Sequence, residues 1–277
     1  MLSEGWNIFI FHKRKQMLRV FFLVLSALFV GIHLRAQPNV RQSSIRVTVG
    51  AVHNRLIDEG LTFDRQKFTG TSFRFMIDYT RKTSSSLLAA TFEMNEGKVD
   101  MNDTDVSASM VNGQLALSYL FGVNALNLQK GKGNFYIGPK VSTIANYLDS
   151  RDRLDNESAL AIHGLYIHAF QHFQITDSKF LEVSLAIPTV GFSKRIVLDG
   201  GLNEPEDTDI SSLLFDETTF GFIRSTEFGL SYSQRLTSLT HFNLRYRFAY
   251  MSNSDFGVIN FYSNELLVGF KFYFRNE

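Results

Sequence analysis

The chain has no cysteine and only four prolines among its 277 residues. The first absence excludes disulfides, thiolate metal sites and a lipid-modified cysteine. The net charge of +1 gives no reason to expect nucleic-acid binding. Beyond the N-terminal region, no segment reaches the about 18 consecutive apolar residues that a membrane-spanning helix needs. If the rest of the chain enters a bilayer, it must do so with strands.

The N-terminal region has the layout of a secretory signal peptide. Basic residues from Lys13 to Arg19 precede the apolar run Val20–Ile32, and a small residue follows at Ala36. We predict cleavage between Ala36 and Gln37, with translation starting at Met1 or Met17. A retained membrane anchor is the alternative, although the apolar run is short for a helical span. Residues 1–36 are therefore an N-terminal extension and signal peptide, and residues 37–277 form one domain.

Apolar and polar side chains alternate along much of this domain, as in strands that face two different environments. We count ten such segments, at 44–53, 68–80, 87–96, 110–122, 134–147, 159–173, 180–195, 221–235, 240–252 and 264–275. Long polar connections alternate with short ones, with 123–133 as an intermediate exception. The sequence predicts an all-β fold, namely an antiparallel, up-and-down transmembrane β-barrel of about ten strands in a Gram-negative-type outer membrane. The alternative is a soluble β-sandwich, which would have to expose whole rows of phenylalanine.

One face of the predicted strands carries rows of large apolar side chains, such as Phe73, Phe75 and Ile77, and we assign it to lipid. In 159–173 the two faces are ambiguous. The opposite face carries ten charges of both signs, namely Arg46, Arg74, Asp78, Glu93, Lys140, Glu182, Glu227, Arg245, Arg247 and Lys271. Inside a narrow barrel such charges are better paired with one another than exposed to a water-filled bore. We therefore predict a lumen plugged by side chains.

The last hairpin contains the one motif-like stretch, from Tyr246 to Asn264. Ser252 and Asn253 form a Ser-Asn pair, and Asn260 follows eight residues after Ser252. This stretch resembles the outer-membrane lipid A deacylase (acyloxyacyl hydrolase-like) family, in which a His-x-Ser-Asn run is followed by a further Asn and an acidic residue. The resemblance covers only this hairpin, and implies that Ser252 is the nucleophile and that Asn260 helps to form an oxyanion hole.

Two positions depart from that family. Tyr250 stands where the family has its histidine, and Asn264 where it has its acid. A phenol with a pKa of about 10 does not replace imidazole as a base at neutral pH. The preferred interpretation is a non-enzymatic structural or interaction barrel, related to the deacylases with its chemistry lost, whose expected partner is outer-membrane lipid or lipopolysaccharide. The alternatives are a lipid A ester hydrolase that uses Ser252 and a small-solute channel. The hairpin can also be interpreted as having no site at all, with Tyr250 simply part of the aromatic girdle of the barrel.

The remaining clusters give weaker signals. His163, His168 and His172 crowd one segment, but they are too far apart or on opposite faces, so we expect structural histidines and no metal site. Two predicted outer loops are acidic, through Asp100, Asp103 and Asp105 in one and Glu204, Glu206, Asp207, Asp209, Asp216 and Glu217 in the other. These loops could gather divalent cations, although solvated loop tips are the default. No cofactor is expected.

Overall fold

The computed structural model describes residues 42–58, 67–83, 85–101, 106–123, 133–149, 156–199, 219–221, 224–253 and 259–274. The predicted signal peptide and cleavage point lie outside these residues, as do all the acidic loop positions except Asp100. None of the described residues forms a helix long and apolar enough to cross a membrane.

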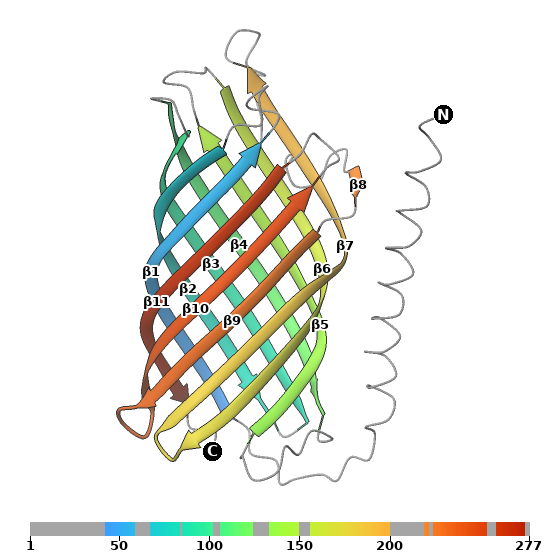
Figure 1. The fold of residues 1–277 in the computed structure, drawn as a ribbon. Helices are drawn as coiled ribbons and strands as arrows, with labels where there is room; N and C mark the ends of the chain where they lie inside the picture. The colour runs from blue at the N-terminus through green and yellow to red at the C-terminus, as the bar shows by residue number, and fades with distance from the viewer. Residues whose placement is uncertain are drawn as a thin grey trace, which may run out of the picture.

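The described residues form eleven antiparallel strands (Figure 1), whose bounds are β1 Gln42–Asp58, β2 Lys67–Lys82, β3 Ser86–Met101, β4 Ser107–Gly122, β5 Gly133–Asp149, β6 Asn156–Thr176, β7 Lys179–Asp199, β8 Thr219–Gly221, β9 Arg224–Arg235, β10 Thr240–Asn253 and β11 Ile259–Phe274. All of these strands except β8 follow one another around a closed sheet, in which β11 pairs with β1 and β9 with β7. The three-residue β8 pairs with the far end of β7. The predicted ten-stranded antiparallel barrel is confirmed.

The two rims of the barrel differ in their connections. The hairpins β2–β3, β6–β7 and β9–β10 turn over a few residues at one rim, which we call the turn rim. The first and last strands also meet there, since Ser43 pairs with Phe274. The other rim, called the loop rim, carries the longer connections such as 59–66 and 200–218. In outer-membrane barrels the long loops are extracellular and the short turns periplasmic, so we expect the loop rim to face outward from the cell.

Several strands run beyond their predicted ends at the loop rim. β1 continues to Asp58 and β11 begins at Ile259, in stretches predicted as loops. The predicted strand 221–235 is instead divided between β8 and β9. The backbone remains paired past the apolar belt because paired N–H and C=O groups are favourable there too. Outside the apolar belt of the wall, however, apolar and polar residues no longer alternate along the strand, so the sequence pattern ends before the strand does.

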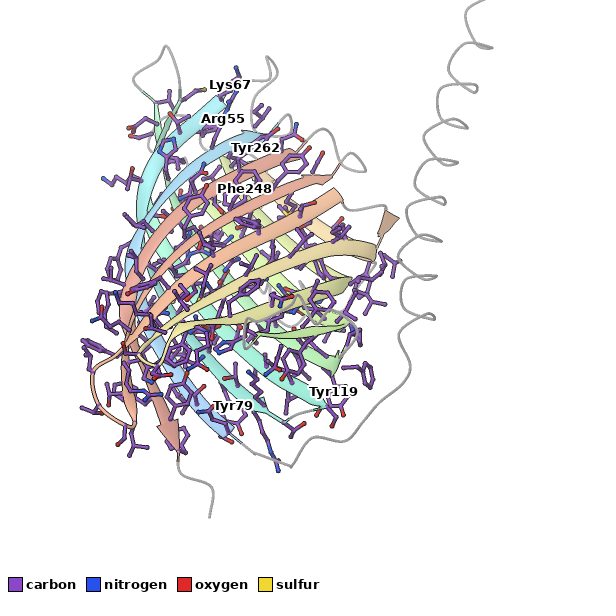
Figure 2. All side chains as sticks on the ribbon, turned by 60° about the horizontal axis from the view of Figure 1, so that its bottom comes forward. Arg55, Lys67, Tyr79, Tyr119, Phe248 and Tyr262 are labelled. Carbon is purple, nitrogen blue, oxygen red and sulfur yellow. The ribbon has the colours of Figure 1, made fainter. Side chains whose placement is uncertain are left out.

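The outward face is apolar, as predicted. Phe73, Leu115 and Phe121 are 61%, 61% and 55% exposed, whereas Arg74, Gln114 and Leu120 beside them point inward and are buried. Figure 2 shows the side chains along this wall, with Tyr79 and Tyr119 near the turn rim and Phe248 and Tyr262 near the loop rim. The ambiguous strand β6 turns Leu165 outward and Tyr166 inward. The barrel therefore presents rows of apolar side chains to its surroundings.

The interior has apolar packing at both ends, with charge between. A loop-rim layer is formed by Leu56, Phe68, Val99, Met101, Ala108, Met110, Leu148, Leu160, Ile162, Met251 and Phe261. A smaller turn-rim layer is formed by Leu87, Leu120 and Tyr136. Most of the inward side chains between these layers are polar or charged, with apolar exceptions such as Met76, Tyr166 and Leu267. The plugged lumen is therefore confirmed, although the sequence reasoning attributed the plug to charges alone.

Candidate functional site

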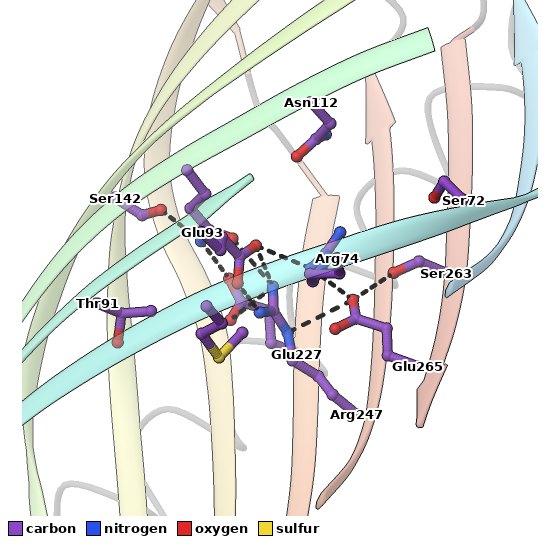
Figure 3. Close-up of polar contacts among 12 residues, drawn as sticks. Ser72, Arg74, Thr91, Glu93, Asn112, Ser142, Glu227, Arg247, Ser263 and Glu265 are labelled. Atoms are coloured by element: carbon purple, nitrogen blue, oxygen red, sulfur yellow. Dashed lines mark hydrogen bonds and ion pairs between the residues drawn. The ribbon is translucent and has the colours of Figure 1, made fainter. Parts of the chain in front are cut away.

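The inward charges gather into two clusters of ion pairs. The upper cluster, nearer the loop rim, consists of Arg74, Glu93, Lys140, Glu227, Arg247 and Glu265. Figure 3 shows Arg74, Glu93, Glu227, Arg247 and Glu265 from this cluster. Arg74 on β2 donates to Glu93 at 3.0 Å and to Glu265 at 2.8 Å. Arg247 on β10 binds both carboxylate oxygens of Glu93. The bidentate contact fixes both groups more firmly than a single bond would.

A second pair completes the upper cluster. Lys140 on β5 contacts Glu227 on β9 at 2.6 Å, and Glu227 lies 3.9 Å from Arg247. Gln114 donates to Glu227 at 3.2 Å and accepts a hydrogen bond from Arg247 at 2.9 Å. The cluster therefore holds three cations and three anions, and its formal charge is zero. Equal numbers of opposite charges reduce the cost of removing all six from water.

The lower cluster, nearer the turn rim, consists of Arg46, Asp78, Glu182, Arg245 and Lys271. Glu182 on β7 accepts from Arg46 at 2.7 Å and from Lys271 at 2.6 Å. Asp78 on β2 accepts from Arg245 at 2.8 Å, and its other oxygen accepts from Thr91. Three cations face two anions, so this cluster carries one formal positive charge.

The structure places all ten predicted luminal charges in these two clusters and adds one that the sequence reasoning left out. Glu265 is 1% exposed and accepts from Arg74 and, at 3.0 Å, from Ser263. Its position has the parity of the inward face, opposite to that of Leu266, although the predicted set of luminal charges omits it. The excess of cations over anions in that set is the signal that could have pointed to a further inward acid.

The space left between the two clusters is small. A cavity of about 90 Å³ is lined by residues of both, including Arg46, Glu93 and Lys140. At about 30 Å³ for each water in the liquid, it has room for roughly three water molecules. The part of the interior formed by the described residues can hydrate its charges locally but offers no room for a larger solute.

The last hairpin places its candidate residues on the outer wall near the loop rim. Tyr250 and Tyr262 lie opposite each other with ring centroids 4.7 Å apart. The Tyr246 hydroxyl donates to Asn264 at 2.9 Å. Ser252 pairs directly with Asn260 across β10 and β11. The structure describes the backbone of Asn253 but not its side chain. The hairpin thus brings a serine and an asparagine together, flanked by tyrosines.

This geometry gives Ser252 no base among the described residues. The imidazole nearest in register is that of His53, which pairs with Asn264. Asn264 also pairs with Phe248, four residues along β10 from Ser252. Four residues of strand span roughly 13 Å, so His53 cannot take the proton of Ser252. Tyr250 remains the side chain in the position of the base.

The three histidines of β6 do not converge. The Nδ1 atom of His168 lies 3.1 Å from the Ser118 hydroxyl inside the barrel, and His172 lies 3.6 Å from Glu182. His163 faces the outer wall, with its Nδ1 atom 3.0 Å from the Thr143 hydroxyl. Each histidine therefore has its own partner on a different part of the barrel.

No protein-family model and no curated protein matches the sequence. Among solved structures, the outer membrane protease OmpT from Escherichia coli matches 87% of this chain and 99% of its own, at 9% identity and a TM-score of 0.57. The chain has the fold of the bacterial outer-membrane β-barrels. Two more such barrels match at lower TM-scores. OprG from Pseudomonas aeruginosa gives 0.40 at 10% identity over 86% of this chain and 98% of its own. The translocator domain of the autotransporter NalP from Neisseria meningitidis gives 0.39 at 13% identity over 96% and 97%.

At these identities the likeness shows the fold alone, because a fold does not determine the function. The function of this barrel therefore has to be inferred from its own side chains. The relevant ones are those that fill the lumen and the polar and aromatic ones of the last hairpin on the outer wall.

Proposed function

We propose that this protein is a closed, non-conducting outer-membrane barrel that acts through contacts of its outer wall and not by transport or catalysis. The observation that carries the proposal is the filled lumen, in which two ion-pair clusters lie between two apolar layers and leave a cavity of about 90 Å³. A path for solutes would require several buried ion pairs to be broken at once, each at a cost of about 3–5 kcal/mol.

Planar-bilayer recording tests this proposal against the channel alternative. Purified barrel inserted into the bilayer should give no single-channel steps over a range of voltages, whereas a general porin added to the same bilayer should conduct. Steady steps from the purified barrel, with a conductance that rises with salt concentration, would contradict the closed lumen.

The proposed partner of the outer wall is outer-membrane lipid, lipopolysaccharide in particular. Two observations support it. Tyr250 and Tyr262 line the wall near the loop rim, the level at which aromatic side chains meet lipid headgroups, and the Tyr246 hydroxyl extends from the middle of β10 to Asn264. The Arg55 guanidinium lies 5.9 Å from the ring centroid of Tyr262 on the same wall, where it can meet an anionic headgroup.

The enzyme alternative is hydrolysis of lipid A acyl esters through Ser252, as the resemblance to the deacylases implies. The outward position of Ser252 opposite Asn260 favours it, and Tyr250 in the position of the base opposes it. We expect purified protein to release no fatty acid from lipid A. Release that Ser252→Ala abolishes would replace our proposal with the enzyme. Release that appears only in Tyr250→His would support a lapsed deacylase.

A further inference from the structure

The outer wall has an apolar depression that none of the functions considered above uses. It spans β2 to β7 and has a volume of about 680 Å³. One row of its lining crosses six paired strands, in the order Ile77, Phe92, Leu115, Thr143, His163 and Phe192. Volumes of about 300–1,000 Å³ are typical of pockets for small molecules.

Two local features accompany the hollow in the wall. Ala90 lies in the neighbouring row of the lining and contributes only a methyl group between larger side chains. At the other end, β7 has a bulge opposite Leu165 and Tyr166, where the Thr189 hydroxyl donates to the Leu165 carbonyl at 2.8 Å. A bulge bends its strand and shifts the phase of the side chains. Beyond it, Val190 and Phe192 line the outer wall.

A polar pair lies within this apolar lining. The His163 ring stacks on Phe192 at 4.8 Å and bonds through Nδ1 to the Thr143 hydroxyl. The other ring nitrogen, Nε2, is buried and has no hydrogen-bond partner among the described residues. Because Nε2 is covered, the polar group of the pair that a ligand can reach is the partly exposed Thr143 hydroxyl, which has hydrogen-bonding capacity beyond its bond to His163. On a surface that faces hydrocarbon, a ligand that brings a hydroxyl to this group is favoured.

We propose that this depression binds an acyl chain of an outer-leaflet glycolipid, with a hydroxyl on that chain at the Thr143–His163 pair. The depression is continuous with the apolar wall that meets the membrane, so lipid is the occupant that reaches it without leaving the bilayer. His163 lies in the half of β6 nearer the loop rim, which places the polar pair on the side of the outer leaflet. This inference rests on the proposed lipid contact and adds to it a second surface, on β2 to β7.

Native mass spectrometry of the barrel released from nanodiscs tests the proposal, with lipid A as the probe in a background of phosphatidylcholine. Wild-type protein should retain lipid A. Ala90→Trp, which fills the depression, should reduce the retained fraction about tenfold, corresponding to about 1.4 kcal/mol. Ala51→Trp is the matched control, because Ala51 is an exposed residue of the outer wall on β1, outside the depression, and this change should leave retention unchanged.

A second variant examines the polar pair. His163→Phe keeps the ring and removes both nitrogens. It should retain lipid A and a synthetic analogue without hydroxyl groups equally, whereas the wild type should prefer the hydroxylated chains. Equal losses from Ala90→Trp and Ala51→Trp, or no loss from either, would overturn the depression as the site and leave the proposed lipid contact standing. Failure of the wild type to retain lipid A above phosphatidylcholine would overturn both. Circular dichroism establishes that each variant is folded.

Discussion

Arg74 and Glu265 form an ion pair of 2.8 Å across the interior, although they stand 191 residues apart in the sequence and β1 lies between their strands. Arg74 also bonds to Glu93 on the other side, so one guanidinium joins three parts of the wall. The pair exists only because the sheet closes between β1 and β11. The closure of the barrel and the filling of its lumen therefore depend on each other.

Removing the carboxylate of Glu265 should therefore destabilise the barrel strongly. In Glu265→Gln, both Arg74 and Arg247 lose an anionic partner in a buried site, and we expect the free energy of unfolding to fall by roughly 3 kcal/mol. Urea unfolding in phospholipid vesicles, followed by circular dichroism, measures it. Glu96→Gln, on the exposed face of β3, is the control and should change stability by less than about 0.5 kcal/mol. Equal effects at the two positions would contradict the buried network.

Lys140 and Glu227 should be energetically coupled. Lys140→Glu and Glu227→Lys each bring like charges together inside the barrel, and the double variant restores an opposite pair at the 2.6 Å contact. A double-mutant cycle should give a coupling energy of about 2 kcal/mol. Recovery should be incomplete because the new lysine lies near Arg247. A coupling energy near zero would show that the two side chains do not meet in the folded barrel.

The loop-rim apolar layer predicts a sharp difference between two phenylalanines of β2. Phe68 is fully buried in that layer, whereas Phe73 is 61% exposed on the outer wall. Phe68→Ala should lower the free energy of unfolding by about 3–5 kcal/mol, since it leaves a cavity. Phe73→Ala should cost about 1 kcal/mol or less. The same unfolding experiment measures both, and a reversed order would mean that the faces of β2 are assigned the wrong way round.

A close approach of backbones makes Gly50 costly to replace, as it does Gly70, Gly138 and Gly269. A Cβ atom at Gly50 would lie 2.0 Å from the Leu266 carbonyl oxygen, and that atom belongs to the backbone of a paired strand. Gly50→Ala should lower stability by about 1–3 kcal/mol or more, because the ladder between β1 and β11 has to shift. At Gly113 the nearest atom is 3.9 Å away, so Gly113→Ala should be tolerated. Thermal unfolding of the two variants under identical conditions compares them directly.

The alternation of side chains carried most of the fold prediction, and its failures have physical causes. Phe73 and Arg74 are neighbours in sequence with opposite environments, and this contrast marks both the strand and its two faces. The pattern failed at the loop rim, where Asn260 belongs to β11 and not to a loop, because strands outside the apolar belt need no alternation. The alternation also failed to show the loop-rim layer. In the sequence, an apolar residue at an inward position looks the same as a strand whose two faces have been assigned the wrong way round.

The candidate sites likewise divide into features that the sequence showed and features that only the structure showed. Parity placed the ten charges inside, and the structure puts Tyr250 and Ser252 on the outer wall. Parity could not show that Glu265 completes the upper cluster or that a bulge in β7 adjoins an apolar depression, since both depend on strands that are distant in the chain.

By itself, the sequence determined that the domain is built from strands with one apolar and one charged face, because a period of two is a local property of the backbone. Only the tertiary structure decided which charge meets which, how far the interior is filled and where the wall is hollow. Those outcomes depend on the register and closure of the sheet, which bring residues from opposite ends of the chain into contact.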